Sequence, residues 1–444
     1  MTKFSYGFFL FLALVLILFT SACKKDENPE SAETATYSHK VATEWFNQFR
    51  NLTKKCSGFT PPVTARAFGY CGVTLYETVV AGMPAHQSLA GQLDALNDVP
   101  KPDSEMEINY AIAANAALAD AARYYYANMS DNLSTVVDNL EATMEEELAV
   151  NISAASLADS KAYGKTVSAF IYEWSKTDGG HEGYLHNFPT DFVVPTGEGL
   201  WVPTSAQLIP LQPYWGSNRT FITSCSENSQ PETGHTPFST ETSSNFYLLA
   251  NEVYTTSINL TEEQETIARY WSDDPGEPGT PPGHSISIAL QILQNENEKL
   301  DKAAITLAKV GIALSDAFVS CWKCKYDYNL LRPVTYINNY IDPNWVTLLS
   351  TPPFPEFVSG HSTQTAAFAT VMNDLFGSQY SFTDHTHEAR TDIDGSPRHY
   401  NNFNECAQEA AISRLYGGIH YSEGNEKGLI MGTEIGDMVN QLNL

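Results

Sequence analysis

Basic residues are scarce in this chain of 444 residues, which contains 25 Lys and Arg against 52 Asp and Glu and carries a formal net charge of −27. So acidic a composition argues against nucleic acid and anionic lipid headgroups as binding partners. The overall field also repels small anions. A site for a small anion must therefore be built from a local cluster of Lys and Arg side chains.

Convincing strand patterns and fixed-period repeats are lacking, and apolar residues instead recur at three- and four-residue spacing. This spacing predicts helices over residues 38–54, 62–93, 106–128, 131–150, 154–176, 240–258, 260–271, 285–300, 301–326, 359–376, 402–421 and 424–441. Residues 178–240 are rich in Gly, Pro, Trp and Thr without a sustained period, so we expect a long irregular segment that wraps the surface or lines a site. The predicted fold class is mainly α, with packed helix bundles.

An apolar run near the N-terminus, FFLFLALVLILF, follows the basic Lys3 and is too short for a comfortable membrane span. The next residues, TSAC, end at Cys23 and resemble the lipobox at which bacterial lipoproteins are cleaved and lipidated. We expect residues 1–23 to be a lipoprotein signal peptide and residues 24–37 a flexible tether; ordinary cleavage near Ala22 is the alternative. The expected location is the envelope of a Gram-negative bacterium, as an outer-membrane lipoprotein with a lipid anchor in the membrane, or in the periplasm or at the cell surface.

Cysteine is infrequent, and beside Cys23 six remain in the all-α domain expected over residues 38–444: Cys56, Cys71, Cys225, Cys321, Cys324 and Cys406. In an oxidising compartment some of them could pair, and six cysteines allow 15 connectivities. Cys321 and Cys324 form a C-x-x-C, but no second C-x-x-C or H-x-x-H stands at zinc spacing. We therefore interpret this pair as incidental.

Three stretches in the catalytic region expected over residues 300–441 carry the chemistry. The first, KCKYDYNLLRP, places Lys325 and Arg332 seven residues apart at the end of a predicted helix, which Pro333 prevents from continuing. The two side chains can converge on one point. The alternative is a solvated basic patch that caps the helix C-terminus.

The second stretch, FPEFVSGHS, has Ser359, Gly360 and His361 at the start of a predicted apolar helix. Ser is a natural N-cap, Gly lets the backbone approach a ligand, and the free N–H groups and helix dipole favour an anion. His361 would lie in the first turn, where it could exchange protons with a bound oxygen. A capped helix with an incidental His is the alternative.

The third stretch, SRLYGGIHYSEG, has Arg414 and His420 six residues apart in the helix predicted over residues 402–421. At 100° per residue they are about 120° out of alignment, yet they can border one cavity if Gly417 and Gly418 loosen the helix. The planar fork of Arg suits tetrahedral oxyanions.

Together and in this order, the three stretches resemble the signature of the superfamily that joins type 2 phosphatidic acid phosphatases to vanadium-dependent haloperoxidases. The matching residues are Lys325-x6-Arg332-Pro333, Ser359-Gly360-His361 and Ser413-Arg414-x5-His420. The resemblance implies a helix-bundle fold of the vanadium haloperoxidase type and a site for phosphate or its analogue vanadate.

The resemblance also implies roles for the matching residues. His420 would be the ligand to vanadium, or the nucleophile on phosphorus. The groups that would neutralise the vanadate oxygens are Lys325, Arg332, Arg414, Ser359 and the Gly360 N–H. His361 would be the acid–base group, and Lys325 would in addition polarise the bound peroxide.

Aromatic residues beside the motif refine the resemblance. Trp322 stands where similar haloperoxidases carry a Trp beside the vanadate, and Phe354 occupies a position that varies with halide preference. Both look most like the bacterial iodoperoxidases. Upstream, IARYWSDDPGEPGTPPGHS resembles a stretch that borders the cavity, which makes Tyr270, Trp271 and His284 candidates for a layer behind the site; a packed loop is the alternative.

The predicted function is vanadate-dependent oxidation of iodide, or of bromide, by hydrogen peroxide to hypohalous acid. The alternative is an acid phosphatase on phosphomonoesters with His420 as nucleophile, because the same cage suits both reactions. A third hypothesis is a non-catalytic envelope lipoprotein that binds an oxyanion or a glycan. Many superfamily members carry an Asp four residues after the final His, where this chain has Gly424, so Glu423 or a residue from elsewhere must fix the His420 tautomer.

Overall fold

The computed structural model describes residues 33–273 and 276–444, so the expected signal peptide, the lipobox and most of the tether lie outside the described residues. A short 3-10 turn, η1 (Thr34–Thr36), already packs onto the fold: Thr34 is buried and its hydroxyl donates to the backbone oxygen of Val79. The packed domain therefore begins a few residues before the expected boundary at residue 38.

The regular structure in the described part of the chain is almost entirely helical, which confirms the predicted fold class. The helices are α1 (Lys40–Lys55), α2 (Pro61–Val79), α3 (Tyr110–Tyr125), α4 (Asp131–Leu148), α5 (Ala154–Ser175), α6 (Cys225–Asn228), α7 (Asn245–Ser257), α8 (Glu262–Tyr270), α9 (Thr280–Asn295), α10 (Leu300–Tyr328), α11 (Pro333–Tyr340), α12 (Gly360–Phe376), α13 (Phe403–Tyr416) and α14 (Ser422–Asn440). One small antiparallel sheet pairs β1 (Phe382–Asp384) with β2 (Arg398–Tyr400).

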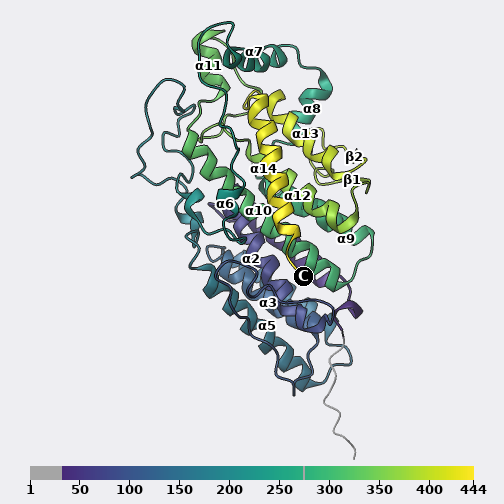
Figure 1. Cartoon of the computed structure of the whole chain (residues 1–444). Helices are drawn as coiled ribbons and strands as arrows, with labels where there is room; N and C mark the ends of the chain where they lie inside the picture. Colours follow the sequence, from purple (N-terminus) through teal and green to yellow (C-terminus); the bar gives the residue numbers. More distant parts are fainter. Residues whose placement is uncertain (1–32, 274–275) are drawn as a thin grey trace, which may run out of the picture.

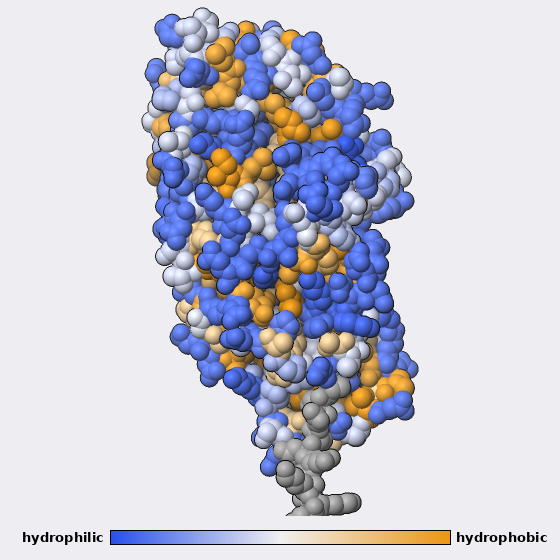
Figure 2. Space-filling view, turned by 45° about the vertical axis from the view of Figure 1, so that its right-hand side comes forward, coloured by the Kyte–Doolittle hydropathy of each residue, from blue (hydrophilic) through white to orange (hydrophobic). Residues whose placement is uncertain are grey.

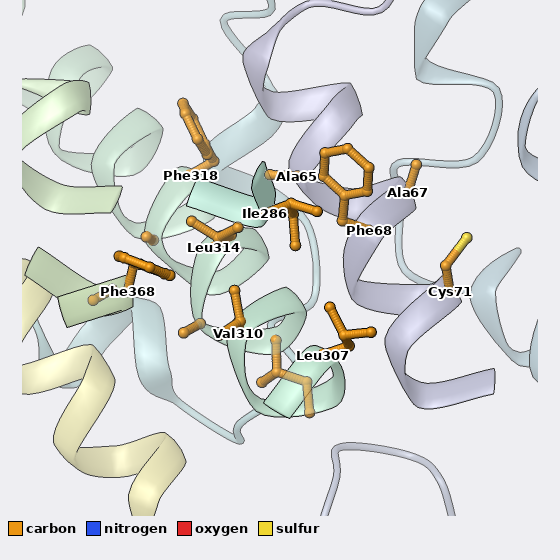
Figure 3. Close-up of a cluster of buried hydrophobic side chains, with 14 of the residues drawn as sticks. Ala65, Ala67, Phe68, Cys71, Ile286, Leu307, Val310, Leu314, Phe318 and Phe368 are labelled. Atoms are coloured by element: carbon orange, nitrogen blue, oxygen red, sulfur yellow. The ribbon is translucent and has the colours of Figure 1, made fainter. Parts of the chain in front are cut away.

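Helix α10 is the centre of the molecule. It packs against α2 of the N-terminal bundle on one side and against α12 and α14 of the C-terminal bundle on the other, as the order of elements in Figure 1 shows. In the core between them, Phe68 of α2 and Ile286 of α9 face Leu314 of α10 (Figure 3). Among the described helices α10 is long and apolar enough to cross a membrane, but 94% of its most apolar stretch is buried, as in the core helix of a globular fold.

The surface seen in Figure 2 is mainly hydrophilic, with apolar residues in separate patches among the polar ones. This agrees with the acidic composition of the chain. All six cysteines within the described residues are buried and free, so no disulfide staples this part of the fold. Its stability comes from the apolar core instead.

Some helix boundaries differ from the prediction. The helix predicted over residues 62–93 ends as an α-helix at Val79, because Gly82 and Pro84 follow and Pro cannot continue the hydrogen-bonded ladder. Helix α11 and the β1–β2 pair were not predicted, since both are too short for their period to be visible in the sequence.

Residues 178–240 are irregular apart from two 3-10 turns and α6, as predicted. The segment is held by backbone contacts to the rest of the fold: the Leu211 N–H donates to Pro353 and the Trp201 N–H donates to Asn329. The Leu211 carbonyl in turn accepts from the indole of Trp322. The segment therefore covers the end of α10 beside the candidate site.

A face of small residues on α14 lets this helix approach α12 closely. A β-carbon at Gly432 would overlap the carbonyl oxygen of Thr363, whereas the neighbouring Thr433 is exposed. We expect Gly432→Ala to lower the free energy of unfolding by about 1–3 kcal/mol, because overpacking outweighs the gain in helix propensity. Urea unfolding measures this, with Thr433→Ala as the matched control. A Gly432→Ala protein as stable as the wild type would mean that α12 and α14 can move apart to accept the methyl group at no cost in stability.

Candidate active site

The three motif stretches meet at one place, where α10 ends and α12 begins. Lys325 lies in the last turn of α10 and Arg332 immediately precedes α11, and both side chains are fully buried. Helix α10 ends because Asn329 adopts a left-handed conformation with φ 49°, and Pro333 then starts α11 as its first residue. The turn between the two helices directs both cations to one side.

Ser359 is the N-cap of α12, as predicted: its hydroxyl accepts from the N–H of Ser362 at 3.4 Å. Gly360 and His361 form the first turn of this helix. The helix dipole and the first backbone N–H groups therefore point toward the buried cations.

The third stretch differs from its prediction. Helix α13 ends at Tyr416 rather than near residue 421, because Gly418 turns the chain out of the helix with φ 75°. His420 thus lies on the short connection before α14 and not on the helix that carries Arg414. The misalignment expected for Arg414 and His420 on one helix therefore does not apply, because the turn directs His420 independently of α13.

His420 has a partner at each ring nitrogen. Its Nδ1 lies 2.7 Å from Oε1 of Glu356, and Nη1 of Arg332 donates to its Nε2 at 3.1 Å. Since Arg can only donate, Nε2 is the acceptor and the proton sits on Nδ1. Burial, followed by the charges of Arg332 and Lys325, holds the pKa of His420 well below its usual value. A neutral imidazole with its lone pair on Nε2 is the form that binds a metal.

The buried cations form a concentrated positive site. Burial lowers the pKa of Arg332 to about 10 and that of Lys325 to about 8. Nη2 of Arg332 is buried and has no hydrogen-bond partner among the described residues. Arg414 is also buried and donates from Nη1 to the backbone oxygen of Trp271. These charges suit a tetrahedral oxyanion, and vanadate fits the donor set.

Lys325 has an arrangement that the sequence did not indicate. Its Nζ donates to three backbone oxygens, those of Pro355, Glu356 and Val358, at 3.1, 2.9 and 2.5 Å. These bonds use all three protons of the ammonium group. Lys325 therefore also fixes the loop before α12, and an oxyanion would share its donors with these carbonyls.

His361 is the predicted acid–base group and lies beside the cations with 16% of its side chain exposed. Its Nε2 is 3.9 Å from Oδ2 of Asp273, and neither atom has a hydrogen-bond partner among the described residues. The backbone of Trp271 lies close to the ring and acts to raise the pKa of His361. Burial, and then the charge of Arg414, lowers the pKa of His361 well below its usual value, so it is a neutral base at neutral pH.

Behind Asp273 lies a buried network. His284 bridges Asp273 at 2.9 Å and Asp384 at 2.7 Å, and the Tyr270 hydroxyl donates to Asp384 at 2.7 Å. The two carboxylates outweigh the burial of His284 and raise its pKa to about 10, so it is a buried cation. The structure therefore places Tyr270 and His284 in a layer behind His361, where His284 holds Asp273.

Asp273, His284 and His387 also approach one another closely enough to hold a metal ion. The His284 nitrogens are, however, both bonded to carboxylates, and His387 bonds to Asp273 at 3.2 Å. The described geometry is that of a salt-bridge network, and we assign no metal to it.

Two aromatic rings cover the cations. The centroids of Trp322 and Phe354 are 5.0 Å apart, and Nζ of Lys325 lies 5.1 Å from the Phe354 centroid. The guanidinium of Arg332 is 5.0 Å from the same centroid. The rings keep water from the cations and attract them through their π-faces.

Comparisons with known proteins agree with this geometry. The family described as the VCPO second helical-bundle domain matches residues 305–347 and 340–443, which include the three motif stretches. The crystal structure of a bacterial vanadium-dependent iodoperoxidase is 32% identical to this chain, with 92% of this chain and 97% of that chain covered and a TM-score of 0.80. The chain belongs to the vanadium-dependent haloperoxidases, and it is accordingly an oxidoreductase.

More distant structures share the fold. A bacterial vanadium-dependent chloroperoxidase in its apo form is 14% identical, with 86% of this chain and 92% of that chain covered and a TM-score of 0.64. The holo form of a bacterial vanadium-dependent chloroperoxidase is 16% identical, with 87% and 94% covered and a TM-score of 0.60. A search of curated protein sequences finds no match.

Two residues of the site were not predicted from the sequence, Glu356 and Asp273. Glu356 stands within FPEFVSGHS, where a lone acidic residue between apolar ones was the available signal, since a buried carboxylate requires a partner. Asp273 stands in a loop with no periodicity, and only the fold brings it to His361.

Proposed function

We propose that this enzyme oxidises iodide, and bromide less efficiently, with hydrogen peroxide as oxidant and vanadate as cofactor. The observation that supports it is the Trp322 and Phe354 pair over the cations, combined with the similarity to a bacterial iodoperoxidase over most of the chain. An apolar, water-poor approach favours the halide that loses its hydration most easily. The Born cost of desolvation falls with ionic radius, which ranks iodide first.

In this proposal, Nε2 of His420 would hold the vanadium. Its oxygens would be neutralised by Lys325, Arg332, Arg414, Ser359 and the N–H of Gly360. When bound, vanadate would supply a Lewis-acid centre that activates hydrogen peroxide for attack by the halide, and the oxidation state of vanadium would stay the same.

The remaining work falls to His361. Its Nε2 can take a proton from incoming hydrogen peroxide and return one to the departing oxygen. Asp273, 3.9 Å away, stabilises the imidazolium that forms in between. The Asp273 carboxylate stays ionised for this purpose although it is buried, because His284 and His387 lower its pKa more than burial raises it.

The proposal predicts that kcat/KM for iodide exceeds that for bromide by about tenfold or more, which corresponds to about 1.4 kcal/mol. The protein comprising residues 33–444 should be purified, stripped with a chelator and given orthovanadate. Hydrogen peroxide is then added with iodide or with bromide, and the two reactions are followed by triiodide formation and by bromination of a dye. Hydrolysis of p-nitrophenyl phosphate by the vanadate-free protein is measured in parallel. Bromide preferred over iodide would refute the ranking, and phosphatase turnover without halide oxidation would refute the proposed function.

A further inference from the structure

The carboxylate that contacts His420 comes from an unexpected place in the chain. Of the two candidates left by the sequence, Glu423 is engaged elsewhere: its carboxylate accepts from the N–H and the hydroxyl of Thr236. Position 424, four residues after His420, is a glycine and offers no carboxylate. The partner of His420 is Glu356, from the loop between α11 and α12.

Glu356 is held at both its side chain and its backbone. It is fully buried, and Oε1 accepts from Nδ1 of His420 at 2.7 Å and from the N–H of Tyr421 at 3.1 Å. Its backbone N–H donates to Leu330 and its carbonyl accepts from Nζ of Lys325. Two bonds to the carboxylate and two to the backbone fix Glu356, so that the carboxylate is preorganised for one orientation of the imidazole.

Gly424 provides the room for this carboxylate. A β-carbon at position 424 would overlap Oε1 of Glu356 and lie 3.0 Å from its Cδ. The start of helix α14 is bonded to the start of α12 at this point, because the Gly424 carbonyl accepts from the N–H of Ser359 at 2.9 Å. The space beside Nδ1 of His420 therefore holds one carboxylate, and in this chain it is supplied by the loop.

We propose that Glu356 is the positioning residue of His420 and that Gly424 is its structural complement, so that the orienting carboxylate is supplied from the loop before α12 instead of from α14. The role follows from the tautomer. Glu356 accepts from Nδ1 while Arg332 donates to Nε2, and both contacts favour the tautomer whose Nε2 lone pair is directed at the cationic cage. The inference rests on the proposed function only in that the ligand of Nε2 is taken to be vanadate.

The tautomer can be tested without vanadate. With ¹⁵N-labelled histidine in the chelator-stripped protein, His420 is expected to show a protonated Nδ1, a proton shifted downfield by the carboxylate, and an unprotonated Nε2. In Glu356→Ala the Nε2-protonated tautomer should appear beside the Nδ1-protonated one, because only Arg332, which donates to Nε2, then favours the latter. In Glu356→Gln, which keeps the shape of the side chain, the Nδ1 proton should move upfield because the acceptor is no longer charged.

Affinity for orthovanadate, measured by equilibrium dialysis, gives a second readout. Glu356→Ala is expected to weaken binding by about 10- to 100-fold, the usual effect of losing an outer partner of a metal-ligating His. Gly424→Asp alone should also weaken binding, because its side chain overlaps Glu356. The double variant Glu356→Ala/Gly424→Asp should recover most of the affinity, since it supplies the carboxylate from α14. Glu423→Gln is the matched control and should bind as the wild type does.

The inference is overturned if Glu356→Ala binds vanadate like the wild type with an unchanged His420 tautomer, or if the double variant is no better than Glu356→Ala. Should Glu356→Ala fail to fold, Glu356→Gln decides, and an unchanged Nδ1 proton there counts against the inference. A wild-type protein that binds no vanadate refutes the proposed function, whereas the tautomer measurement still tests Glu356.

Discussion

Replacement of His420 by alanine is expected to reduce vanadate-dependent iodide oxidation by about a thousandfold or more, since it removes the ligand atom and the geometry of the site with it. The fold should survive, because Glu356 and Arg332, which flank the ring, can pair directly once it is gone. The measurements are triiodide formation at saturating hydrogen peroxide and vanadate affinity by equilibrium dialysis.

His399→Ala is a suitable control, because His399 is exposed on β2 and its ring bonds to the hydroxyl of Thr383 at the surface. Its activity should match that of the wild type. If His420→Ala retained iodide oxidation within about tenfold of the wild type, His420 could not be the residue that holds vanadium, and the assignment of the third motif stretch would be wrong.

Replacement of His361 by alanine is expected to lower kcat by about 10²–10⁴-fold, the usual contribution of a general acid–base group. Vanadate affinity should change far less, because the oxyanion charge is neutralised by Lys325, Arg332 and Arg414. The two variants thus separate binding, which depends on His420, from proton transfer, which depends on His361. Stopped-flow kinetics with iodide, beside a vanadate titration, measures both.

The pH dependence gives an independent test of His361. Because burial and Arg414 lower its pKa, the ring is neutral and able to accept a proton down to a pH below the ordinary imidazole value of about 6.5. As pH falls through the lowered pKa the base is lost, so the acidic limb of kcat/KM should lie below that value. This limb should disappear in His361→Ala. A limb that persists there, or a kcat within about threefold of the wild type, would assign proton transfer to another group.

Local interactions explain what the sequence determined. The period of apolar residues predicted the helices, and Ser359 predicted the start of α12, because a cap and a helix depend on residues a few positions apart. The order and spacing of the three motif stretches indicated the family, since the chemistry of an oxyanion site requires those residue types. Helix ends differed from the prediction where a helical pattern of apolar residues continues past a glycine. Gly418, for example, ends α13 before His420.

Only the tertiary structure decided which side chains meet. Nothing in the local pattern relates Glu356 to His420 or Asp273 to His361, because contacts between residues 64 or more apart depend on how α10, α12 and α14 pack. The packing also brings three backbone carbonyls of the loop before α12 within hydrogen-bond distance of Nζ of Lys325. The sequence thus determined which groups the site contains, and the packing of the bundles determined their orientation and protonation, since burial and neighbouring charge set the pKa of each group.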